Sequence, residues 1–376
     1  MANQCRQLAD LLGREDVRVL LVRSNAPYRP RWIGRVRWVR EPFRLFPYLA
    51  DLWRTIRGAE VAHLFANSGW SWYLVATPAI LIARMRGIPL IVNYRGGNAE
   101  SFFSGAPFWA TRTLAAADSV IVPSRYLQGV FEKLGLKPSV IPNVIDLDRF
   151  TSRSGGEEPR LAQHIVITRN LERVYDIPTA IRAFALVRSR FPQATLTIAG
   201  AGPELAPLEN LCRSLGLAGA VRFAGPLDPI AVARLYRSAT LMLNPSLVDN
   251  MPNSVLEAFA SGTAVVSTNV GGVPFIAEHE RTALLVEPGD YQAMAAAVLR
   301  LLDDAPLLER LTRSAYDQVQ HYGWPRVREL WLAEYARLAH TRKERKDWFA
   351  RSLRSRRKRG TADVDRGAGR DNQIDA

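Results

Sequence analysis

The sequence is poor in cysteine and has no long apolar run. Cys5 and Cys212 are its two cysteines, and they lie far apart without the spacing of a disulfide framework or a zinc site. The most apolar run, residues 73–83, is far shorter than the about 20 residues of a membrane span. No basic and then apolar segment opens the chain. These absences predict a protein made and kept in the cytoplasm.

The chain is too long for a single ordinary core. It has 376 residues, of which 48% are hydrophobic, and this predicts two domains with a tail. A stretch rich in Ser, Gly and Pro predicts a linker at 151–160. We therefore expect a first domain at 1–150, a second at 161–325, a helix at 326–340 that returns to the first domain, and a basic, disordered tail at 341–376.

Positive charge is concentrated in two segments of a chain with a net charge of +14. Arginines alternate with aromatic residues from Arg29 to Arg57, and cations dominate from Arg342 to Arg359. Arginine heads between aromatic rings suit an anionic membrane surface, and the alternatives are an amphipathic helix over a sheet and a solvated tail. A charged surface carries no sequence specificity by itself, so nucleic acid is not an expected partner.

The most informative stretch runs from Asn244 to Glu257. A short apolar strand at 239–243 leads into a turn at Pro245, a polar loop, and a helix from Pro252 to Gly262. This layout points backbone N–H groups and the positive end of a helix dipole at an anion. Carboxylates beside a phosphate site would repel the phosphate, so Asp249 and Glu257 suit the hydroxyls of a ribose and a sugar on either side. A nucleotide-sugar site is indicated; the alternative is a solvated loop acid and a helix-surface acid.

This stretch resembles the donor-binding signature of glycosyltransferase family 4 (glycosyl transferases group 1), of the exopolysaccharide type. That family carries two Glu separated by seven residues, and this chain has Asp249 at the first position. Residues 262–274 and 283–290 also match the family in order and spacing. The resemblance implies an α/β protein of GT-B fold, in which two Rossmann-like domains face each other across a cleft. It also implies no metal and no cofactor, because the nucleotide sugar is a substrate.

The resemblance assigns roles to individual residues. Asp249 and Arg169 are the expected catalytic residues, with Arg169 on the donor phosphates and Asp249 on the transferred sugar. The expected donor-binding residues are Glu257, Arg173, Asn250, Met251, Asn253, Ser254, Val255, Gly200 and Gly202. On the acceptor side we expect His63, Arg95, Gly96 and Gly97.

The chain departs from the family pattern at two of these positions. The family has a Lys shortly after Arg169, and here that role is vacant or passes to Arg173. Arg95 stands where the family has a His; a guanidinium stays protonated and cannot act as a base, although it could bind an acceptor diphosphate.

The first strand of the family pattern is missing. Residues 1–12 read as a helix and residues 17–22 as a strand. The family begins instead with a strand and a Gly-rich turn before such a helix. We therefore interpret Met1 as lying just after that turn, because of a late start codon or a truncation; the alternative is a true start with a compensated sheet.

Together these features predict a retaining glycosyltransferase that moves a sugar from a nucleotide diphosphate sugar, with UDP the expected nucleotide. The expected acceptor is a hydroxyl of a lipid-linked glycan at the inner face of the cytoplasmic membrane, in cell-surface polysaccharide synthesis. Two alternatives remain. One is a catalytically silent GT-B partner of a membrane assembly, and the other is a nucleotide-sugar epimerase, which shares this two-domain shape.

Overall fold

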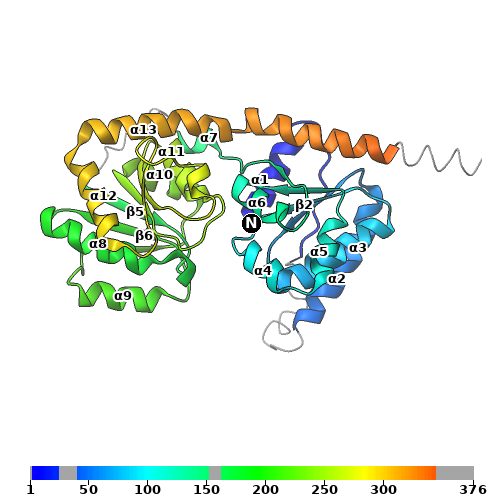
Figure 1. Ribbon diagram of the computed structural model, residues 1–376, viewed down its shortest axis with the longest axis horizontal. Helices are drawn as coiled ribbons and strands as arrows, with labels where there is room; N and C mark the ends of the chain where they lie inside the picture. Colours follow the sequence, from blue (N-terminus) through cyan, green and yellow to red (C-terminus); the bar gives the residue numbers. More distant parts are fainter. Residues whose placement is uncertain (1, 25–39, 152–161, 344–376) are drawn as a thin grey trace, which may run out of the picture.

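The computed structural model describes residues 2–24, 40–151 and 162–343. Two α/β domains lie side by side, and one long helical stretch connects them along one edge (Figure 1). Three expectations fall wholly or largely outside the described residues. These are the linker at 151–160, the basic tail at 341–376, and the first part of the Arg29–Arg57 segment.

The first domain is built on a parallel sheet of four strands in the order β1-β2-β3-β4. The strands are β1 (Ala62–Ala66), β2 (Leu90–Tyr94), β3 (Ser119–Val122) and β4 (Ser139–Val140). The two central strands are buried on both faces, which is why they read as apolar runs without alternation. Ile91 and Ile121 face one layer of helices, while Val92 and Val122 face the other.

Helices cover both faces of this sheet. On one face, α1 (Ala2–Gly13) and a C-terminal helix at 324–343 pack through Leu8, Leu12 and Trp331. On the other face lie α3 (Thr77–Met85), α4 (Ala99–Gly105), α5 (Phe108–Ala115) and α6 (Arg125–Glu132). The helix α2 (Arg40–Thr55), which continues into η2 (Ile56–Gly58), packs outside α3. A π-helical segment, η3 (Trp72–Ala76), precedes α3.

The predicted strand at 17–22 is wrong. These residues form no strand, and Val19, Leu20 and Leu21 are 36%, 43% and 54% exposed. An apolar pattern favours a strand only where a neighbouring strand supplies hydrogen bonds. Within the described ranges β1 pairs with β2 alone and forms the edge of the sheet. The sheet therefore ends at β1, and residues 17–22 remain outside it.

The second domain has a parallel sheet of six strands in the order β10-β9-β8-β5-β6-β7. The strands are β5 (His164–Thr168), β6 (Thr195–Ala199), β7 (Val221–Gly225), β8 (Leu241–Asn244), β9 (Ala264–Thr268) and β10 (Leu284–Val286). Strand order reverses between β5 and β8, and ligands bind at such a switch point in doubly wound sheets.

Helices also cover both faces of the second sheet. One layer contains α8 (Ile177–Arg190), α9 (Leu205–Ser214) and α12 (Tyr291–Asp303). The other contains α10 (Pro229–Ser238) and α11 (Asn253–Ala260), and α13 (Ala305–Val319) packs against both layers. Three short helices complete the domain: η4 (Arg173–Tyr175), η5 (Val273–Phe275) and η6 (Gln320–Tyr322). The short helix α7 (Leu147–Phe150) packs on α10 and α11, so Phe150 belongs to the core of this domain.

The C-terminal helix leaves the second domain after η6 and lies along the first domain (Figure 1). Its Trp331 is fully buried against the sheet of the first domain. At its start the indole N–H of Trp324 donates to a carboxylate oxygen of Glu15 at 2.9 Å, and at its end Arg342 donates to the Ala59 carbonyl at 2.6 Å. The helix thus fixes the two domains relative to each other. No helix within the described ranges is both long and apolar enough to span a bilayer.

Candidate active site between the two domains

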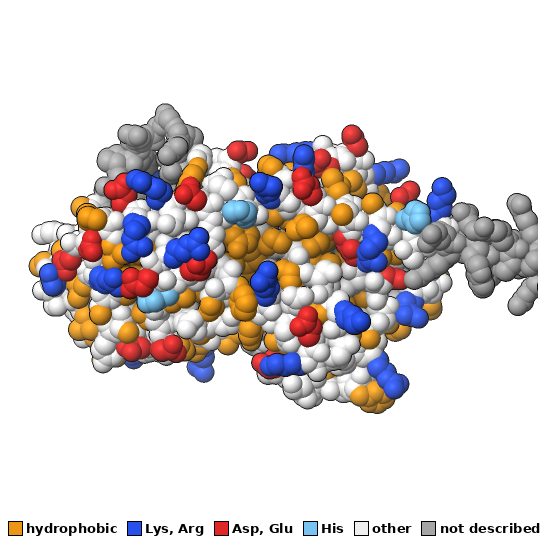
Figure 2. Space-filling view, turned by 45° about the horizontal axis from the view of Figure 1, so that its top comes forward, with side chains coloured by type: hydrophobic (Ala, Val, Ile, Leu, Met, Phe, Trp, Pro, Cys, Tyr) orange, Lys and Arg blue, Asp and Glu red, His pale blue; other side chains and the backbone are white. Residues whose placement is uncertain are grey.

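A cavity of about 380 Å³ lies between the domains. Its walls come from the loops that follow strand ends: Asn67–Gly69 after β1, Arg95 and Asn98 after β2, Tyr175 after β5, and Val248–Met251 after β8. The carboxyl ends of both parallel sheets therefore face the same space, as at ligand sites of doubly wound folds. Figure 2 shows apolar side chains gathered at the boundary between the domains and charged ones scattered over both.

The loop after β8 is held by close backbone packing. Pro245 follows the last residue of β8, and Pro252 is the N-cap residue of α11. The Gly272 N–H donates to the Asp249 carbonyl at 2.9 Å, and a Cβ at Gly272 would overlap the carbonyl oxygen of Asn250. Gly271 has a φ of +52°, which glycine adopts without strain. These two glycines therefore fix the position of the Asp249 and Asn250 backbone beside the cavity.

Asp249 and Arg169 form an ion pair at the ends of β8 and β5. Both side chains are only 12% exposed. The Arg169 guanidinium also donates to Ser246 Oγ at 3.0 Å and lies 4.4 Å from the ring centre of Tyr175. Burial lowers the pKa of Arg169, while the tyrosines and Glu257 oppose that shift. The two expected catalytic residues are thus brought together, and here they bind each other.

Glu257 lies in the second turn of α11 and is partly buried. Burial raises its pKa from 4.5 to about 7, and the charges of Arg169 and Arg149 oppose the rise. Its carboxyl group therefore titrates near neutral pH, where a proton exchange costs little free energy. A group of this kind can accept hydroxyl hydrogen bonds when ionised and donate one when protonated.

Gly200 and Gly202 shape the loop that carries Arg169. A Cβ at Gly200 would overlap the carbonyl oxygen of Arg169, and one at Gly202 would overlap that of Leu171. The Leu171 N–H donates to the Ala201 carbonyl at 3.0 Å. In this structure the two glycines therefore permit loop packing beside the site.

The structure separates Arg173 from Arg169. The Arg173 side chain is 91% exposed and donates to a Glu204 carboxylate oxygen at 3.2 Å. Neither arginine lines the cavity, but Asp249, the partner of Arg169, does, and so do Val174 and Tyr175.

Two asparagines connect the domains beside the cavity. Asn250 Nδ2 donates to the carbonyl oxygens of Arg95 at 3.1 Å and Gly96 at 2.5 Å. Asn143 Nδ2 donates to the Met251 carbonyl at 3.2 Å and to Asn253 Oδ1 at 2.7 Å. Met251 is buried, as are the first-turn residues Ser254 and Val255 of α11. These amide contacts set the width of the cavity.

His63 lies under the C-terminal helix and does not line the cavity. Its Nδ1 lies 2.6 Å from the Tyr335 hydroxyl, and Asn93 Nδ2 lies 3.0 Å from its Nε2. Burial, with a smaller contribution from Arg95, lowers its pKa from 6.5 to about 3. Because Nε2 accepts a hydrogen bond from Asn93, the proton of the neutral ring is on Nδ1, which donates to the Tyr335 hydroxyl. His63 therefore links the C-terminal helix to the sheet.

The other expected acceptor-side residues do lie at the cavity or beside it. Arg95 lines it and donates from Nε to Asn93 Oδ1 at 2.9 Å; burial lowers its pKa to about 10, so it remains a cation at pH 7. Gly96 packs against the side chains of Asn67 and Ser68. A Cβ at Gly97 would lie 3.7 Å from Val248 of the other domain.

Sequence reasoning missed several polar residues of the cavity wall. These are Gln4, Asn67, Ser68, Asn98, Asn143 and Tyr175. Asn67 and Asn98 follow strand ends, and that position was a usable signal. Asn143 shares this signal because it follows β4, whereas Tyr175 lies in η4, well after the end of β5, and carries none. No group of three His, Cys, Asp or Glu in the described part of the chain is placed to hold a metal ion; the absence of a metal or cofactor stays a prediction.

Two α/β domains with parallel sheets, and a cavity between the carboxyl ends of those sheets, form the GT-B class of protein. A family model described as Glycosyl transferases group 1 matches residues 149–318, and one described as Glycosyltransferase Family 4 matches residues 1–149. The chain belongs to these glycosyltransferase families, as its motifs predicted.

The chain is similar to several known proteins. Glycogen synthase of Mycobacterium tuberculosis is 30% identical over 271 residues, which cover 68% of this chain and 64% of that protein. Sucrose-phosphate synthase from Thermosynechococcus elongatus has the same fold, with a TM-score of 0.65, 22% identity, and 79% of each chain covered. So does HepE of Anabaena in complex with UDP, with a TM-score of 0.64, 18% identity, and coverage of 77% of this chain and 82% of that one.

Proposed function

We propose that this protein is a retaining glycosyltransferase that moves a sugar from a UDP-sugar to an acceptor hydroxyl. The observation that carries the proposal is the cavity at the carboxyl ends of both sheets, with the Arg169–Asp249 pair where β5 and β8 end. The UDP complex of HepE, a protein with the same fold, supports the choice of nucleotide.

Each residue of the pair then has a role. Arg169 and the N–H groups at the start of α11 stabilise the leaving diphosphate, and preorganised donors of this kind usually supply the largest catalytic contribution. Asp249 binds the hydroxyls of the transferred sugar, and Glu257 binds those of the ribose. The acceptor attacks on the face that the diphosphate leaves, and its proton passes to the leaving phosphate oxygen. No protein nucleophile is required.

Donor binding requires the Arg169–Asp249 pair to rearrange. A phosphate oxygen replaces the carboxylate on the guanidinium, and Asp249 turns its oxygens to the sugar. Ser246 and Tyr175 keep Arg169 in place during the exchange, because their contacts do not involve the carboxylate. The exchange substitutes one charge-assisted contact for another, so it costs less free energy than leaving Arg169 without an anionic partner.

The proposed acceptor is a lipid-linked glycan at the inner face of the cytoplasmic membrane, in cell-surface polysaccharide synthesis. Arg95 supplies a cation on the acceptor side of the cavity, and Asn67 and Asn98 supply amide groups for hydroxyls. The basic segments Arg29–Arg57 and Arg342–Arg359 would hold the protein on anionic lipid.

The test is a donor screen with the full-length protein. UDP-, GDP- and ADP-sugars are incubated with and without lipid-linked acceptors, products are identified by mass spectrometry, and their anomeric configuration is determined by NMR. We expect transfer from a UDP-sugar with retained configuration, and loss of transfer in Glu257→Ala. Conversion of the nucleotide sugar into its epimer in the absence of an acceptor would establish that the protein is an epimerase instead. Binding of every donor without turnover would establish a silent partner.

A further inference from the structure

Large apolar side chains are exposed on one side of the first domain. Trp70, Phe108, Phe46 and Met85 are 78%, 73%, 72% and 67% exposed. By contrast, Phe275 is the one strongly exposed Phe or Trp of the second domain in the described part of the chain. This side is formed by α2, α3 and α5, which pack against one another on the sheet face opposite the C-terminal helix (Figure 1).

The helix α2 has apolar residues on two opposite sides. Tyr48, on the side that packs against the domain, is buried, and so is Ile56 of η2, which continues the helix. Phe43, Phe46 and Trp53 recur at helical spacing on the opposite side and are 51%, 72% and 37% exposed. A helix that only covered a core would need a single apolar side. Phe43 and Phe46 therefore leave a second apolar side largely exposed in the described fold, while Trp53 packs on Arg86 at its end.

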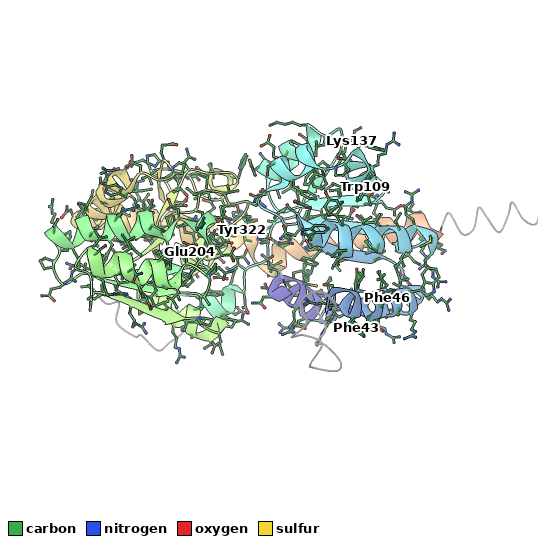
Figure 3. The ribbon with its side chains drawn as sticks, turned by 90° about the horizontal axis from the view of Figure 1, so that it is seen from below. Phe43, Phe46, Trp109, Lys137, Glu204 and Tyr322 are labelled. Carbon is green, nitrogen blue, oxygen red and sulfur yellow. The ribbon has the colours of Figure 1, made fainter. Side chains whose placement is uncertain are left out.

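Exposed rings continue from α2 across α3 to α5. Leu81 and Met85 of α3 are exposed, and so is Trp109 of α5, the helix that packs on α3. Trp70 contacts Tyr73 at 6.2 Å between ring centres, and Tyr73 contacts Trp109 at 5.3 Å. Figure 3 looks onto this side, with Phe43 and Phe46 on α2 and Trp109 on α5 labelled. We call it the aromatic face, defined as Phe43, Phe46, Trp53, Trp70, Leu81, Met85, Phe108 and Trp109.

Arginines lie among these rings. The Arg86 guanidinium lies 3.5 Å from the ring centre of Trp53, and that of Arg112 lies 5.3 Å from that of Phe108. Arg84 of α3 is exposed as well, and neither α3 nor α5 contains an acidic residue. Exposed rings with guanidinium groups beside them match an anionic lipid surface in both polarity and charge.

We propose that the aromatic face docks on an anionic bilayer, with its rings at headgroup depth and the exposed Arg84 and Arg112 on lipid phosphates. The charge pattern of the sequence predicts membrane contact through residues 29–57. In the structure, α3 and α5, which lie further along the chain, belong to the same proposed contact surface. The bilayer lies against α2, α3 and α5 (Figure 1), so this docking does not require the basic segment Arg342–Arg359, which follows the C-terminal helix in the sequence.

This docking places the lipid surface next to the cavity. Trp70 follows directly on Asn67–Gly69, which line the cavity wall after β1. A bilayer at Trp70 therefore meets the acceptor side of the cavity, and a lipid-linked acceptor reaches it without leaving the membrane. This last step rests on the proposed function, whereas the docking itself does not.

Vesicle binding without any substrate tests the docking. The full-length protein is floated with vesicles of phosphatidylcholine alone and with vesicles of equal parts phosphatidylcholine and phosphatidylglycerol. The test variants are Phe43→Ser/Phe46→Ser on α2 and Phe108→Ser/Trp109→Ser on α5. The matched control is Ile230→Ser/Phe275→Ser, which replaces side chains that are 64% and 49% exposed on the second domain. Thermal unfolding verifies that each variant is folded.

We expect binding to the anionic vesicles only, reduced about tenfold in each test variant and unchanged in the control, because two interfacial rings are lost. For a variant that fails to fold, Trp70→Phe and Trp109→Phe provide a second readout: brominated lipid should quench less tryptophan fluorescence than in the parent while binding persists. Test variants that bind like the parent would overturn the proposal. So would a protein dimer that the test variants dissociate without any vesicle binding.

Discussion

Asp249→Asn separates the two roles that the active site gives to Asp249. The substitution keeps the shape of the side chain and removes the charge that pairs with Arg169. Because both partners are 12% exposed, the pair is neither fully buried nor freely solvated. Arg169 keeps its contacts with Ser246 and Tyr175 and so stays near its position.

The expected magnitudes follow from this environment. Two unit charges 4 Å apart at an effective dielectric constant of 20 attract each other by about 4 kcal/mol. With Ser246 and Tyr175 still in contact, we expect the free energy of unfolding to fall by about 2 kcal/mol, below the usual cost of leaving one buried charge unpaired. UDP no longer has to displace a carboxylate from Arg169, so its Kd should fall about tenfold. Sugar transfer loses a charged hydrogen-bond acceptor and should fall roughly 10- to 100-fold.

Three measurements check these values: denaturant unfolding, calorimetric titration with UDP, and kcat for transfer. The matched control is Asp303→Asn, which removes the acid of a surface pair with Arg190 at 2.9 Å and should change none of the three by much. Weaker UDP binding in Asp249→Asn would refute the reasoning, because the carboxylate would then organise Arg169 and not compete for it. An unchanged kcat would remove the sugar-binding role.

Two further predictions concern groups with shifted pKa values. Burial raises the pKa of Glu257 from 4.5 to about 7, so its contribution to the stability of the folded protein is lost as pH rises through that range. The ionised carboxylate that forms is the state that binds ribose hydroxyls. The affinity for a UDP-sugar should therefore rise as pH increases through 7, and Glu257→Gln should abolish the slope; a slope retained in the variant would count against this role. His63, whose pKa is lowered to about 3, should stay neutral in the folded protein, so stability should fall as pH drops below 6.5. Denaturant unfolding at several pH values should show that the free energy of unfolding falls less steeply at low pH in His63→Gln than in the parent. An equal fall in the two proteins would contradict this prediction.

Much of the fold could be predicted from local patterns. The strand at 164–168 and the helices at 177–190 and 229–238 lie where the spacing of apolar residues and the positions of Pro and Gly predict them. Strands of a parallel sheet are buried on both faces and read as continuous apolar runs, which makes them easy to recognise. Residues 17–22 show the same pattern and still form no strand, because the pattern carries no information about a pairing partner.

Less of the candidate site could be predicted. The motifs place Arg169 and Asp249 at strand ends, but their mutual ion pair depends on the packing of β5 beside β8. The amide bridge from Asn143 to Asn253 joins segments 110 positions apart, which no local signal reports. His63 matched an acceptor-side motif, yet the C-terminal helix covers it with Tyr335. Contacts between distant segments are what the sequence pattern leaves out.

The most direct test of the account compares Arg169 with Arg173 in UDP binding. Arg169 was expected on the donor phosphates, and Arg173 was the candidate for the role of the missing Lys; Arg169 is buried beside Asp249, and Arg173 is 91% exposed beside Glu204. If the diphosphate binds where β5 and β8 end, Arg169→Ala should weaken UDP binding in calorimetry by roughly 10- to 100-fold, the usual value of a hydrogen bond between charged groups. Arg173→Ala should change it less than about twofold. Equal losses in both variants, or normal UDP binding by Arg169→Ala, would contradict the central claim.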